Sequence, residues 1–173
     1  AKLASAAYAT GTSAVGTGTL TLATGGKSFA VTIDGTNNTL AGIRDAINAA
    51  KDNPGVAATL VTANDGVRLV LTSAGTGAAS AITVAQAGGD GGLAPLAYDP
   101  ANGISGLTSL QAAQDARIVV DGFTYDSPTN GVSGALERDL AAVKALEIAR
   151  LLDEAIARAE QMRKQYPDHS QAY

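Results

Sequence analysis

The sequence predicts an α+β fold, in which an antiparallel β-rich domain with one or two short helices precedes a long C-terminal α-helix. Three observations lead to this expectation. Short apolar stretches with period-2 alternation recur through most of the chain and are separated by Gly-rich turns. From Leu40 the apolar residues instead follow the period of a helix. Residues 137–165 contain no Gly or Pro and are rich in strong helix formers.

The first elements are predicted to form a β-hairpin. The N-terminal segment is small and polar, and we expect one short strand near residues 6–10. Residues 19–24 and 28–33 alternate apolar with small or polar side chains. A Gly-Gly pair lies between them, and Gly readily supplies the positive φ of a tight hairpin turn. The two stretches are therefore expected to pair as antiparallel strands.

The next stretch is predicted to be a strand–turn–helix unit that buries one face. Asp34 and Gly35 break the strand, because Asp hydrogen-bonds nearby backbone and Gly tolerates positive φ. Asn38 or Thr39 is placed to cap the following helix, which is expected over residues 40–52 and ends before a Pro-Gly pair. The residues of its buried face are spaced at helical intervals: Leu40, Ile43, Ile47 and Ala50.

A second predicted hairpin follows the helix. Residues 56–63 and 67–73 are rich in β-branched and aliphatic side chains, and an Asn-Asp-Gly turn separates them. Both faces of these strands carry apolar residues, including Val61 and Val70. We therefore expect the strands to lie at the centre of a sheet and to bury Val61 and Val70.

A long loop and a second strand–turn–helix unit are predicted to complete the β-rich domain. After a short strand at residues 82–85, residues 86–110 show little periodicity, and long loops of this kind are usually functional or mobile. This segment is the candidate surface-recognition loop, pinned to the domain by Leu93, Leu96 and Tyr98. A strand is expected over residues 112–121. Its Val-Val-Asp-Gly end echoes residues 32–35, and residues 129–136 weakly echo the first helix.

The C-terminal segment, residues 135–173, is predicted to be a long amphipathic helix with a polar tail. Its apolar residues alternate at intervals of three and four, which is typical of a coiled coil. One interpretation is that this stripe docks on its own domain, and the other is that it pairs with another chain. The candidate oligomer interface consists of Ala145, Ile148, Leu152, Ala155, Ala159, Met162 and Tyr166.

Composition and charge argue against several classes of function. The net charge is −4 and the Lys and Arg residues are scattered, which does not favour nucleic-acid binding. No apolar run approaches the roughly 20 residues that span a bilayer. The chain has no Cys, and its one His, His169, lies in the polar tail, so we expect no cofactor and no metal site. Asp34 and Asp121 each precede Gly and are interpreted as turn residues, not as a catalytic pair. The sequence predicts no enzyme.

Three motifs carry a resemblance to a known family. The runs IDG…TLAGIRDAIN, GVAATLV and RLVLTSAGTGAA occur in this order between residues 33 and 79. Together they resemble the central part of the flagellar filament cap family, hook-associated protein 2. The stretch at about residues 29–50 resembles the flagellin hook IN motif. The resemblance covers residues 1–136 and implies that residues 1–134 form the outer domain of a cap.

The resemblance implies a structural role outside the cell. Such a domain belongs to a cap that self-associates and assists flagellin assembly at the filament tip, after export through the flagellar channel without a cleaved signal. Adhesion to a host-surface glycoprotein is a further role in this interpretation. The alternative is an adhesin-like or phage-tail-like β-domain binding module with a helix used for oligomerisation. Residues 135–173 do not resemble the family, and the abrupt change in composition favours a foreign or engineered helix over a divergent family member.

Overall fold

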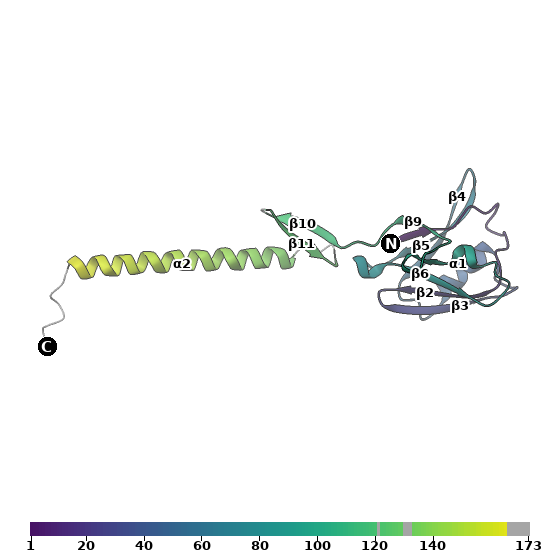
Figure 1. Cartoon of the computed structure of the whole chain (residues 1–173), viewed down its shortest axis with the longest axis horizontal. Coiled ribbons are helices and arrows are strands. Elements are labelled where there is room, and N and C mark those ends of the chain that lie inside the picture. The colour runs from purple at the N-terminus through teal and green to yellow at the C-terminus, as the bar shows by residue number, and fades with distance from the viewer. Residues whose placement is uncertain (121, 130–132, 166–173) are drawn as a thin grey trace. The chain divides into compact units, whose positions relative to one another are not determined.

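A computed structural model describes residues 1–120, 122–129 and 133–165 and confirms the α+β class (Figure 1). The α-helices of this described part are α1 (Leu40–Ala49) and α2 (Ser133–Gln165). The strands are β1 (Lys2–Ala4), β2 (Gly18–Thr24), β3 (Lys27–Ile33), β4 (Val56–Ala63), β5 (Gly66–Ser73), β6 (Thr83–Ala87), β7 (Tyr98–Asp99), β8 (Ile104–Ser105), β9 (Thr108–Gln111), β10 (Ala116–Val120) and β11 (Phe123–Ser127). The chain divides into two compact units, Ala1–Asn130 and Gly131–Tyr173.

The first unit contains two larger antiparallel sheets and a separate two-stranded ribbon. The strand orders are β4-β5-β1-β9 and β3-β2-β6-β7-β8, and β10 pairs with β11 alone. The prediction of a strand at residues 6–10 is wrong. The strand is β1, which lies between β5 and β9, because β5 offers a free edge to Lys2–Ala4. Residues 6–10 contribute a single bridge, from Tyr8 to Val67.

One hydrophobic core joins the two larger sheets and α1. The predicted inner face of α1 is confirmed for Leu40, Ile43 and Ile47, which are fully buried. Ala50 is only partly buried, because it lies just past the end of the helix. The core also includes side chains from both sheets: Leu3, Leu69, Leu71, Leu20, Leu22, Phe29, Val31 and Ile33.

Only one of the two valines expected to be buried is buried. Val70 lies on β5, inside its sheet, and is 6% exposed. Val61 lies on β4 and is 49% exposed, because β4 is the edge strand of that sheet. The expectation that both faces of both strands are covered is therefore wrong for β4.

The segment predicted as a long loop has secondary structure of its own. Short 3-10 helices at Ala94–Leu96 and Pro100–Asn102 alternate with β7 and β8, and β9 begins before the segment ends. The backbone is held by local hydrogen bonds, including Leu96 N–H to the Leu93 carbonyl at 2.9 Å. The interpretation of residues 86–110 as one unstructured loop is therefore wrong.

The second strand–turn–helix unit is not formed as predicted. Gly122 adopts a φ of +86°, and the chain returns directly into β11, so the element is a β-hairpin. The strand β10 also begins four residues later than expected, at Ala116. Asp121, which was interpreted as a turn residue, lies outside the described residues. The long helix begins at Ser133, earlier than the Gly-free stretch suggested.

Candidate interaction surfaces

The turn that enters α1 is built from polar side chains. The Asp34 carboxylate accepts hydrogen bonds from the Thr36 backbone N–H at 2.8 Å and from the Thr36 hydroxyl at 2.6 Å. These bonds lower the pKa of Asp34. The Asn37 side chain accepts from the Asp34 N–H at 2.8 Å and donates to the Thr32 carbonyl at 3.1 Å. Asp34 therefore closes a turn.

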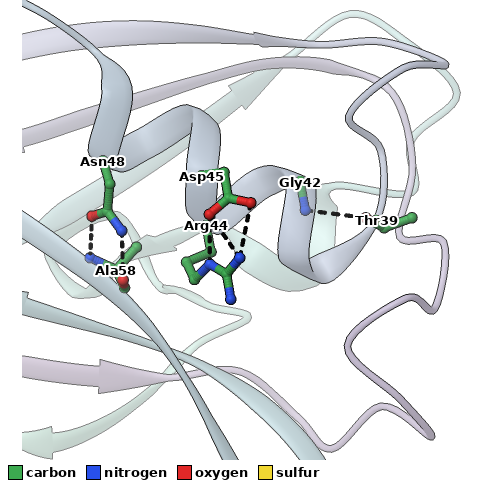
Figure 2. Close-up of polar contacts among 6 residues, drawn as sticks. All are labelled: Thr39, Gly42, Arg44, Asp45, Asn48 and Ala58. Carbon is green, nitrogen blue, oxygen red and sulfur yellow. Dashed lines mark hydrogen bonds and ion pairs between the residues drawn. The ribbon is translucent and has the colours of Figure 1, made fainter.

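Two residues fix the start of α1. The Thr39 hydroxyl accepts a hydrogen bond from the Gly42 N–H at 3.0 Å, so of the two predicted cap candidates, Asn38 and Thr39, the N-cap is Thr39 (Figure 2). At Gly42 the helix approaches the preceding turn so closely that a Cβ would lie 2.5 Å from the Asn37 carbonyl oxygen. A glycine at this position lets the first turn of α1 pack directly on the Asx-type turn before it.

Asn53 organises the exit from α1. Its amide nitrogen donates to the Ile47 carbonyl at 3.0 Å and to the Val56 carbonyl at 2.8 Å. Its amide oxygen accepts from the N–H groups of Gly55 at 3.0 Å and Val56 at 2.7 Å. The predicted helix over residues 40–52 is too long, since α1 ends at Ala49 and Asn53 carries the chain on into β4.

Asn48 joins α1 to the edge of a sheet. Its amide donates to the Ala58 carbonyl and accepts from the Ala58 N–H, both at 2.8 Å (Figure 2). Because β4 is an edge strand, these Ala58 groups would otherwise lack a partner in the ladder. The Asn48 side chain therefore holds α1 against β4 through these two hydrogen bonds.

The solvent face of α1 carries one ion pair. The Arg44 guanidinium donates to Asp45 through Nε at 2.7 Å and through Nη2 at 2.8 Å (Figure 2). The Arg44 side chain is partly exposed and the Asp45 side chain is largely exposed, and solvent-exposed pairs of this kind contribute little to stability. Arg44 and Asp45 leave this face of the helix polar.

Other carboxylates of the first unit are engaged in local contacts. Asp90 accepts from the N–H groups of Thr17 and Gly92, both at 2.9 Å, and these bonds lower its pKa. Asp65 and Asp126 are paired with arginines, and a hydrogen bond from the arginine lowers the pKa of each. Among the described residues, no group of three His, Cys, Asp or Glu side chains could hold a metal ion. These carboxylates hold turns and hairpins together.

Comparison with known proteins identifies the family. The family model described as the flagellin hook IN motif matches residues 19–75. The B-type flagellar hook-associated protein 2 of Pseudomonas aeruginosa is 40% identical over 129 residues, which cover 69% of this chain and 27% of that protein. The solved D2-D3 domains of the flagellar cap protein FliD from Escherichia coli superpose with a TM-score of 0.67 at 31% identity, covering 76% of this chain and 69% of that one. The chain belongs to the flagellar hook-associated protein 2 family.

Hook-associated protein 2 of Escherichia coli strain K12 is a further relative, 36% identical over 117 residues, covering 66% of this chain and 25% of that protein. The chain thus spans about a quarter of the length of these curated relatives. The matched IN motif runs from β2 through β5 and includes α1. The contacts of Thr39, Gly42, Asn48 and Asn53 are therefore the architecture of the IN motif in this member of the hook-associated protein 2 family.

The candidate recognition residues of the 86–110 segment lie mostly in the core. Leu93 and Leu96 are buried, and Tyr98 is partly buried against the same cluster. These side chains anchor the segment and leave its polar parts exposed. A recognition role for the segment stays a prediction, and any such role would have to use the exposed polar residues around these anchors.

The predicted oligomer interface lies on α2. Every described side chain from residue 143 to residue 165 is exposed, including the larger apolar members of the stripe. Tyr166, the last predicted member, lies outside the described residues, as does His169. Among the described helices, none is long and apolar enough to cross a membrane.

Proposed function

We propose that this chain is an outer part of a flagellar filament cap, located outside the cell at the filament tip, where it assists flagellin assembly. The observation that carries the proposal is the 40% identity over 129 residues with the B-type flagellar hook-associated protein 2. The IN motif supports it, because its matched residues form the centre of the first unit. This role requires two partners, which are further copies of the same protein and flagellin.

The proposed mechanism is steric and involves no catalysis. The polar side chains of the IN motif are used to fix backbone: Asp34 closes a turn, Asn48 holds a strand edge and Asn53 holds a loop. A unit tied together in this way can present a constant surface to neighbouring subunits. Neither adhesion nor a phage-tail-like role gains support from the comparisons.

Replacement of the corresponding segment tests this function. We would exchange that segment of the Pseudomonas aeruginosa B-type protein for residues 1–130 of this chain and express the chimera in a strain lacking the native cap. The chimera is expected to restore filament growth and to lower the amount of flagellin released into the medium, as measured by immunoblotting and by swimming assays.

A matched chimera with Ile43→Asp serves as the control, because Ile43 is fully buried in α1 and a charge there disrupts the core. A folded, secreted chimera that leaves flagellin release at the level of the cap-less strain would contradict the proposed function. Circular dichroism of the purified 1–130 segment distinguishes that result from a failure to fold.

A further inference from the structure

The larger apolar side chains of the α2 stripe are exposed to solvent. Ile148, Leu152 and Met162 are 59%, 56% and 64% exposed. Leu151 and Ile156, at 55% exposure each, widen the apolar surface beside the stripe. Exposed apolar side chains that follow one another along a helix mark a surface that binds another helix. The occupant can be inferred from the sizes and charges along the stripe.

The order of side-chain sizes along the stripe favours an antiparallel pair of identical helices. From N to C the stripe reads small, large, large, small, small, large: Ala145, Ile148, Leu152, Ala155, Ala159 and Met162. Read in the opposite direction, each large residue meets a small one. Ala145 then faces Met162 of a second copy, Ile148 faces Ala159, and Leu152 faces Ala155.

A parallel pair would pack less evenly. In a parallel pair in register each residue faces itself, so layers of two alanines would alternate with layers of two large side chains. Helices fill the space between them best when large and small residues face each other. The antiparallel pair gives every layer the same composition of one large and one small side chain, which permits one constant distance between the helices.

Charges beside the stripe favour the same orientation. Arg158 and Arg163 flank it on opposite sides, at the positions that meet across a parallel coiled coil. A parallel pair would therefore place Arg158 of each copy beside Arg163 of the other. In the antiparallel pair these two arginines lie about 20 Å apart along the axis, at 1.5 Å per residue. Opposed helix dipoles add to this preference.

We propose that two copies of this chain associate through α2 as an antiparallel coiled coil with Leu152 and Ala155 at its centre. The pairing uses the second unit and does not depend on the cap function proposed for the first. The partner of the stripe is a second copy of this chain, because in an antiparallel pair each large side chain of one stripe faces a small side chain of the other.

The mass of the full chain in solution tests the association. Light scattering is expected to give twice the chain mass of 17.2 kDa at tens of micromolar protein. Leu152→Asp should return the monomer mass. The matched control is Leu146→Asp, which introduces the same charge on the same helix outside the stripe, at a side chain that is 73% exposed, and should remain dimeric.

Cysteine cross-linking tests the orientation, because the chain has no Cys of its own. A mixture of Ala145→Cys and Met162→Cys chains is expected to form the mixed disulfide at least tenfold more than either variant forms a disulfide with itself. Efficient cross-linking of each variant alone would show a parallel pair and overturn the proposal. A monomeric wild-type chain would also overturn it, and would assign the stripe to a different protein or to the chain's own first unit.

Discussion

At the scale of single residues, asparagine amides replace backbone partners at the end of the IN helix. Asn53 makes four hydrogen bonds with backbone groups of Ile47, Gly55 and Val56. Asn48 makes two with Ala58. Each amide offers a donor and an acceptor in one plane, as a peptide group does. The two side chains therefore satisfy backbone groups at the end of the helix, in the following loop and at the edge of the sheet.

Replacement of Asn53 should destabilise the first unit. Asn53→Ala leaves partly buried backbone groups without partners, and we expect the free energy of unfolding to fall by about 2–3 kcal/mol. Urea denaturation followed by circular dichroism measures the change. Asn102→Ala is the control, since Asn102 is exposed and donates to the Asp99 side chain in an exposed hydrogen bond, and its loss should change stability by less than about 0.5 kcal/mol. Equal effects of the two variants would contradict the role given to Asn53.

The Asp65–Arg68 pair predicts a pH dependence. The hydrogen bond from Arg68 lowers the pKa of Asp65 to about 2 in the folded chain. A carboxyl whose pKa is lower when folded stabilises the fold above its unfolded pKa, near 4, and this stabilisation is lost as the pH falls through about 2. The wild type should therefore exceed Asp65→Asn in melting temperature at pH 7, and the difference should close toward pH 2. A difference that stays constant across this range would show that ionisation of Asp65 is not its cause.

At the scale of elements, Gly42 shows how α1 is fitted to the turn before it. Ala is normally favoured over Gly inside a helix by about 1 kcal/mol. Here the added methyl would lie 2.5 Å from the Asn37 carbonyl oxygen, so Gly42→Ala should instead destabilise the unit by about 1–3 kcal/mol. Thermal unfolding measures the effect. Gly35→Ala, in the same turn with no neighbouring atom within 4 Å, should be close to neutral.

The elements with strong periodicity were predictable from the sequence. The alternation of Phe29, Val31 and Ile33 gave β3, and the spacing of Leu40, Ile43 and Ile47 gave the inner face of α1, because each pattern reflects burial on one side. Asn38 and Thr39 were both recognisable as cap candidates from their place before the helix, and the structure shows that Thr39 is the cap. The strand, the inner face of the helix and its cap depend on residues that are close together in the sequence, so the sequence shows them directly.

Elements that depend on distant partners were not predictable. β1 is a strand because β5 and β9 flank it, and nothing in its own three residues signals this. The edge position of β4, which exposes Val61, follows from the strand order. The contact of Asn48 could not be foreseen, since its partner Ala58 is brought to it only by the fold. An Asn in the last turn of the helix and another before Pro-Gly are the only signals that could have pointed to these contacts.

At the scale of the whole molecule, the chain has two units, and the statements about each unit rest on different evidence. The IN motif lies entirely within the unit Ala1–Asn130. Membership of the hook-associated protein 2 family is established by the identity to the relatives compared above. The unit Gly131–Tyr173 contains α2, whose open stripe carries the inference about a second copy. The assignment of residues 135–173 to a foreign or engineered helix stays a prediction.

The contact between Asn48 and Ala58 affects whether other chains can add strands to the edge of this sheet. An exposed edge strand is a template on which further chains can stack into fibrils. By occupying both backbone groups of Ala58, the Asn48 amide acts as a strand of one residue and interrupts the edge of β4 near its start. Copies of this chain can thus lie close together without their sheets fusing along this edge.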